Sequence, residues 1–139
     1  SGDPRRGCQA RRAAPRGRKL SLSEGFRAMA RLTSDFWVSA YLRQMAHDGL
    51  VAVLRRRGAA EAGAIFVKLD RLDGTAALYG PAPQALAETG GERRFQLVLD
   101  GDPATIEEKV ERERRFDPDL WLIEVEDRSG NPRLPLVEP

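Results

Sequence analysis

The first organised stretch of the chain has the pattern of an amphipathic helix between about Ser34 and Asp48. Apolar residues recur there every three or four positions, the spacing of one helix face: Trp37, Val38, Tyr41, Leu42 and Met45. Thr33 or Ser34 can cap the first turn, and Gly49 suits the left-handed conformation that ends many helices. The width of the apolar stripe predicts a helix that lies on a sheet.

Five segments with the pattern of strands follow, at residues 50–54, 64–69, 75–79, 95–99 and 120–126. The first is a continuous apolar run, which we interpret as a buried strand. Asp73-Gly74 separates the second and third and is typical of a two-residue hairpin turn. That turn places Leu69 opposite Leu78. The predicted register then puts Val67, Leu69 and Leu78 on one face and Phe66, Lys68 and Tyr79 on the other.

A second helix is predicted between the fourth and fifth strands. Asp102 is a good N-cap, Pro103 suits the first helical position, and Asp117-Pro118 ends the helix. Its apolar stripe is thin, since it consists of Ala104, Ile106, Val110 and Phe116. This helix can therefore cover the core from one side only. Residues 84–92, before the fourth strand, are predicted to form a loop, because they contain Gly90-Gly91 and no apolar periodicity.

These elements predict an α+β fold in the order α-β-β-β-β-α-β. We expect a single, mainly antiparallel sheet with both helices on one face, because the register gives most strands one consistently apolar face. The domain spans residues 31–130. Residues 131–139 are a proline-rich extended tail that lies across the sheet or hangs free.

The formal charge of +2 conceals an asymmetry along the chain. Residues 1–31 carry nine basic and two acidic groups, which leaves 14 basic and 19 acidic groups in residues 32–139. The composition of residues 1–30 predicts a disordered basic extension. We favour Met29 as the natural start, because it stands directly before the organised region. The alternative is a genuine basic arm that binds nucleic acid or anionic lipid.

Few residues suggest catalytic chemistry. His47 is the only histidine and Cys8 the only cysteine, and no nucleotide-binding motif is present. Arg55, Arg56 and Arg57 are a possible anion contact, but the more ordinary interpretation is a solvated strand end. Asp117, Asp119, Glu124 and Glu126 lack the ligand spacing of a calcium loop. We therefore predict no catalytic residue, no cofactor and no metal site.

Several separated motifs resemble a small alphaproteobacterial family of unknown function. They are Arg31-Leu32-Thr33-Ser34 with Phe36-Trp37-Val38, Glu61-Ala62-Gly63-Ala64-Ile65-Phe66, Leu78-Tyr79-Gly80-Pro81-Ala82-Pro83, and Asp117-Pro118-Asp119-Leu120-Trp121 with Glu124-Val125-Glu126. The resemblance covers about residues 29–130. It implies no activity, cofactor or site residue, and it supports a start near Met29.

The sequence favours a small cytoplasmic, non-catalytic interaction module. With both helices on one face, an apolar group would remain on the other face to bind a protein partner or a second copy: Phe66, Tyr79, Val98 and Leu122. One alternative is an enzyme with a site of carboxylates and arginines. Another is weak, non-specific nucleic-acid binding by residues 1–28. We expect no membrane association and no nucleic-acid binding by the acidic body.

Overall fold

The computed structural model describes residues 33–83 and 93–137. The predicted basic extension and the predicted loop at residues 84–92 lie outside the described residues. The described elements are α3 (Ser34–His47), β1 (Val51–Arg56), β2 (Ile65–Asp70), β3 (Ala76–Pro81), β4 (Phe95–Gly101), α5 (Pro103–Phe116) and β5 (Trp121–Glu126). The predicted order α-β-β-β-β-α-β is confirmed.

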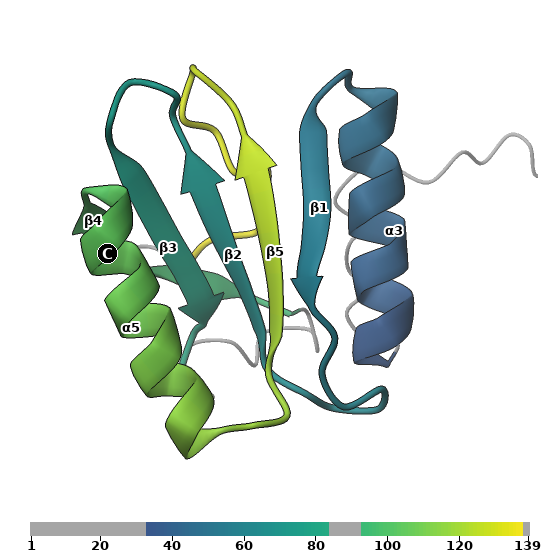
Figure 1. Cartoon of the computed structure of the whole chain (residues 1–139). Coiled ribbons are helices and arrows are strands. Elements are labelled where there is room, and N and C mark those ends of the chain that lie inside the picture. Colours follow the sequence, from purple (N-terminus) through teal and green to yellow (C-terminus); the bar gives the residue numbers. More distant parts are fainter. Residues whose placement is uncertain (1–32, 84–92, 138–139) are drawn as a thin grey trace, which may run out of the picture.

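The five strands form one sheet in the order β1-β5-β2-β3-β4 (Figure 1). The last strand along the chain, β5, lies between β1 and β2. It pairs in parallel with β2, and the other three pairings are antiparallel. The predicted mainly antiparallel sheet is therefore confirmed, with β1 and β4 as its edge strands.

Both helices begin and end where the sequence predicts. The side chain of Asp102 accepts a hydrogen bond from the Thr105 amide at 2.9 Å, and Pro103 occupies the first turn of α5. At the end of α3, Gly49 has a φ of +79°, the left-handed conformation that favours glycine. The start of α3 differs in detail. The amides of Ser34 and Asp35 donate to carbonyls of the 60–61 loop, while the Thr33 side chain makes no capping bond.

The two helices lie on opposite faces of the sheet, so the prediction of both helices on one face is wrong. Helix α3 packs with one set of strand residues, Val67, Leu69, Ile123 and Val125. Ile106 of α5 packs with the set that alternates with it, Phe66, Leu78 and Leu122. Five consecutive residues of β2 are buried, although their side chains alternate between the two faces. This central strand is therefore covered on both faces of the sheet. An amphipathic helix can therefore cover either face.

The predicted hairpin register is also wrong, by one residue. Leu69 pairs with Ala77 and Val67 with Tyr79, so Leu69 and Leu78 point to opposite faces. The connection is a three-residue loop, closed by a bond from the Arg71 amide to the Thr75 carbonyl. Leu72 in this loop has a φ of +61°. Its amide donates to the Asp70 side chain at 2.8 Å, which holds a conformation that the Asp-Gly signal does not predict.

The sheet curls around α3. Helix α3 packs beside the edge strand β1, yet its Trp37 ring lies 5.2 Å from the ring of Phe95 in the other edge strand. Both edges can approach one helix only if the sheet is curved. We call the α3 side the concave face and the α5 side the convex face.

The C-terminal tail lies across the sheet, which was one of the two predicted alternatives. The Tyr41 hydroxyl donates to the Pro132 carbonyl at 2.7 Å, and Leu134 packs against the concave-face core. Further on, the Phe95 amide donates to the Pro135 carbonyl at 2.9 Å. The tail therefore runs from β5 to β4 behind the strands in the view of Figure 1.

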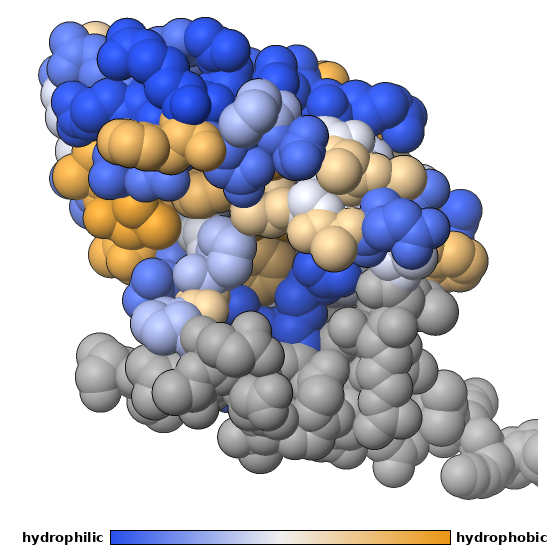
Figure 2. Space-filling view, turned by 90° about the horizontal axis from the view of Figure 1, so that it is seen from below, coloured by the Kyte–Doolittle hydropathy of each residue, from blue (hydrophilic) through white to orange (hydrophobic). Residues whose placement is uncertain are grey.

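Charged side chains cover the outer surface of α5. Lys109 pairs with Glu113 at 3.1 Å, and Arg114 pairs with Glu111. Figure 2 views the molecule from below and shows hydrophilic residues along its upper side, with apolar residues beneath them. The ion pairs on the outer surface of α5 suit it to contact with water.

Candidate partner-binding face

Part of the convex face has no helix over it. Helix α5 packs over β3 and β4, and its Ile106 also packs with Phe66 of β2 and Leu122 of β5. In the described part of the chain, no helix covers the convex side of β1 or of the C-terminal ends of β5 and β2 beside it (Figure 1). We call this area the open face and define it by Val51 and Val53 of β1, Glu124 and Glu126 of β5, and Asp70 of β2. The pairing places Val51, Glu126 and Asp70 in one row across the strands. Val53 and Glu124 lie in the next row.

The two valines are the apolar part of the open face. Val51 is 57% exposed and Val53 is 50% exposed. The residues between and beside them on β1, Ala52 and Leu54, point to the concave face and pack against the α3 core. The prediction that this segment is a fully buried strand is therefore wrong, because β1 is an edge strand with a helix on one side only.

An ion network borders the open face and ties α5 to the sheet. The Arg55 guanidinium donates to both oxygens of Glu107, at 2.6 and 3.0 Å, and lies 3.1 Å from Glu124. Lys68 Nζ lies 2.5 Å from Glu107 Oε2 and 3.9 Å from Glu124 Oε2. Lys68 is buried. A buried ammonium is costly without anions beside it, so the two glutamates compensate its charge.

Two groups of this network, Glu107 and Arg55, have pKa values that favour their charged forms. Hydrogen bonds from Arg55, together with those from Lys68, lower the pKa of Glu107 from its usual value near 4.5 to about 2. The bond with Glu107 likewise raises the pKa of Arg55. Both pKa values move away from neutrality, whereas a general acid or base works best with a pKa near the working pH. The network therefore suits a structural or electrostatic role.

Two carboxylates of the open face lack a cation. The Glu126 side chain makes no hydrogen bond or ion pair with any described residue, and the Asp70 carboxylate accepts only the Leu72 amide among the described residues. Other carboxylates near the same end of the sheet are paired, as Asp100 is with Arg71 at 2.7 Å and Asp127 with Arg133 at 2.8 Å. The open face thus combines two exposed valines with uncompensated negative charge.

The residues predicted to form an exposed apolar face do not form one. Phe66 and Leu122 are buried beneath α5, where the half-buried Val98 packs beside them. Tyr79 belongs to the opposite, concave face and is only 8% exposed. This prediction is wrong for two reasons. The register error moved Tyr79 to the wrong face, and α5 covers the face that was expected to be open.

The three consecutive arginines point to three different partners. Arg55 joins the ion network, Arg56 donates to the Pro118 carbonyl at 2.6 Å, and Arg57 lies over the Trp121 ring at 5.3 Å. The structure therefore does not bring their guanidinium groups together around one anion. The described residues also hold no group of three or more His, Cys, Asp or Glu side chains placed to bind a metal ion.

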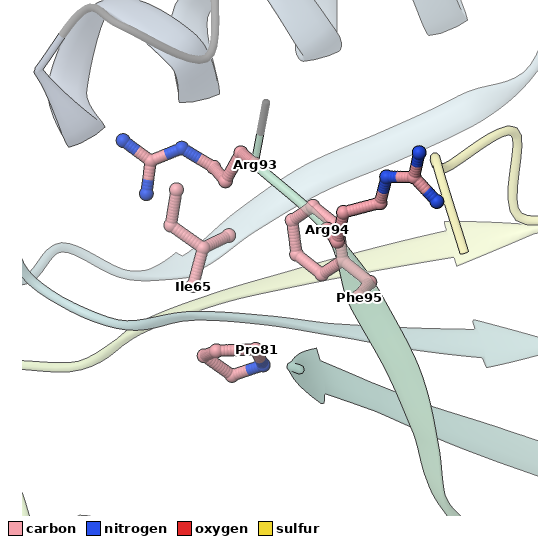
Figure 3. Close-up of a pocket in the computed structure, with 5 residues that line it drawn as sticks. All are labelled: Ile65, Pro81, Arg93, Arg94 and Phe95. Atoms are coloured by element: carbon pink, nitrogen blue, oxygen red, sulfur yellow. The ribbon is translucent and has the colours of Figure 1, made fainter. Parts of the chain in front are cut away.

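Two hollows elsewhere on the molecule are less suited to binding. The one in Figure 3 measures about 20 Å³ and is lined by Ile65, Pro81, Arg93, Arg94 and Phe95. That volume holds about one water molecule. The two arginines point away from each other in Figure 3, and Arg94 donates to the Leu136 carbonyl at 3.4 Å. A wider hollow of about 270 Å³ has Phe36 and Arg43 among its lining residues, which all come from the outer side of α3. Its described walls therefore offer no converging polar groups from different elements.

The alternation of residues in β1 already indicates which of its sides is exposed, although we predicted a buried strand. Val51 and Val53 alternate with residues of the concave face and share their side of β1 with Arg55. A charged residue in the same alternation marks that side as the solvent side. The carboxylates could not be found in this way, because their proximity to the valines depends on β5 lying beside β1. No helix in the described part of the chain is long and apolar enough to cross a membrane.

Comparisons with known proteins agree with the fold. Residues 32–135 match the sequence model of a family described as "Protein of unknown function (DUF1491)". A solution structure of a protein from A. tumefaciens is 43% identical, with a TM-score of 0.68, over 78% of this chain and 97% of that one. The crystal structure of a DUF1491 family protein from Caulobacter crescentus is 34% identical, with a TM-score of 0.65, over 78% and 99% of the two chains. No curated protein matched this chain.

Proposed function

This chain belongs to the DUF1491 family, and we propose that it is a non-catalytic interaction module that binds a protein partner through its open face. The observation that carries the proposal is the exposure of Val51 and Val53 beside two carboxylates that have no cation. Exposed apolar residues with a polar rim are typical of protein-binding surfaces. As part of the proposal we place the protein in the cytoplasm.

The charge of the open face favours a different protein over a second copy as the partner. Two copies joined through this face would bring Glu126 and Asp70 of one copy toward the same residues of the other. Like charges at a contact cost several kcal/mol. A partner with apolar residues and a basic rim would instead bury the valines and pair with the carboxylates.

Site-specific photo-crosslinking in the source cells tests the proposal. A benzophenone amino acid is placed at position 53 on the open face and, as a control, at position 112 on the exposed side of α5. We expect a discrete crosslinked protein from position 53 only. That protein should bind the purified chain directly, and Glu126→Lys should weaken the binding. Equal crosslinking from both positions, or none from position 53, would contradict the proposal.

A further inference from the structure

The open face is complementary to the N-terminal segment of the same chain. Residues 1–31 carry nine basic groups against two acidic ones. The body is acidic, and Glu126 and Asp70 on the open face lack cations. The sequence left two interpretations of this segment, and the open face supports the one in which it is a genuine arm.

We propose that residues 16–22 of the N-terminal segment dock on the open face of the same molecule and compete there with the partner. In an extended segment, side chains at every second position share one side. That side carries Arg16, Arg18, Leu20 and Leu22. The two leucines can cover Val51 and Val53 while the two arginines reach the carboxylates of β5 and β2.

The chain between the docking segment and the body is long enough for this contact. Helix α3 has 14 residues and is therefore about 21 Å long. It starts at one end of the sheet, and β1 starts at the other end, beside the end of α3 (Figure 1). The 12 residue-to-residue steps from Leu22 to Ser34 span up to about 40 Å when extended. They can therefore run the length of α3 and pass around the edge of β1.

Docking of residues 16–22 would occupy the surface that the partner needs. An intramolecular segment competes at an effective concentration in the millimolar range, even when its own affinity is low. A partner must then displace the arm before it binds the valines. The inference uses the same face as the proposed function. Its test needs no partner, so each of the two can fail without the other.

Paramagnetic broadening in the full chain tests the docking. A nitroxide is attached at position 21 in a Cys8→Ser, Ser21→Cys chain, which keeps a single cysteine. Broadening of the backbone amide signals is then measured by NMR. We expect the strongest broadening at residues 51–53 and 124–126, and little at residues 112–116 on the far end of α5. Raising the salt from 0.05 to about 0.5 M should weaken it, because the Debye length falls below about 10 Å.

Two matched charge reversals locate the contact. Glu126→Lys changes the open face, and Glu108→Lys makes the same change in net charge on the exposed side of α5, where Glu108 has no ion pair with a described residue. The broadening at residues 51–53 should fall at least twofold with Glu126→Lys and stay unchanged with Glu108→Lys. Broadening that only declines with distance from Thr33 would overturn the proposal, as would equal effects of the two variants. As a further control, a spin-labelled chain is mixed with an isotope-enriched chain that carries no spin label. We expect no broadening in this mixture, because broadening there would show docking between molecules and would contradict docking within one chain.

Discussion

Lys68 Nζ lies 2.5 Å from Glu107 Oε2, and this contact joins the centre of the sheet to α5. Arg55 binds the same carboxylate from β1. One glutamate of α5 therefore holds two strands that do not pair with each other. The position of α5 over β3 and β4 leaves the open face uncovered, so this ion network helps to determine which part of the convex face stays accessible.

Glu107→Gln should make stability less dependent on acid pH. The folded-state pKa of Glu107 is about 2, below its usual value near 4.5. Its stabilising effect is therefore complete above about pH 4.5 and is lost as the pH falls toward 2. The variant should unfold more easily by about 1 to 3 kcal/mol at pH 7, and the difference should vanish near pH 2. Urea unfolding across this pH range measures it. Glu108→Gln is the control and should change nothing.

Leu69→Ala should destabilise the protein strongly. Leu69 is fully buried on the concave face, and truncating a buried leucine costs about 2 to 5 kcal/mol. Val53→Ala, on the half-exposed open face, should cost less than about 1 kcal/mol. Guanidinium unfolding of both variants tests the assignment of the two faces. Similar costs for the two substitutions would show that Val53 is buried.

The hairpin loop offers a stabilising substitution. Leu72 has a φ of +61° and is exposed, and a left-handed conformation costs most residues about 1 to 2 kcal/mol. Asparagine tolerates this conformation, so Leu72→Asn should raise the free energy of unfolding by up to about 1 kcal/mol. Leu72→Ile should lower it, because a branched β-carbon fits this region poorly. The opposite order of melting temperatures would show that the loop has a different conformation.

Local signals predicted the elements well. Asp102 and Pro103 marked the start of α5, and the strand segments were found from their apolar residues. The faces were harder to predict, because β2 and β5 carry buried apolar residues on both sides. In addition, Leu72 takes a left-handed conformation that the Asp70 side chain supports. The position of β1 at an edge depends on β5, which is distant in the sequence. The exposure of Val51 and Val53 is therefore a property of the topology and not of the segment alone.

Nucleic-acid binding by the body is not expected. Affinity for nucleic acid rests largely on basic groups that neutralise phosphates, and residues 32–139 contain more acidic than basic groups. A chain that begins at Met29 should bind an unstructured oligonucleotide much more weakly than the full chain, whose binding should fall steeply with salt. Fluorescence anisotropy of both chains at several salt concentrations measures this. Retained affinity in the shorter chain, or its loss with Arg56→Glu alone, would refute the prediction.

The most direct test of the central claim uses the partner found by crosslinking. Its affinity is measured for two variants of this chain that each carry one inserted negative charge. Val53→Glu places a charge in the middle of the open face, and Ser39→Glu places the same charge on the exposed side of α3. Calorimetric titration should show at least a tenfold loss of affinity with Val53→Glu and no loss with Ser39→Glu, while both chains keep their melting temperature within a few degrees. Equal affinity of Val53→Glu and the unchanged chain would contradict the assignment of the open face as the binding surface.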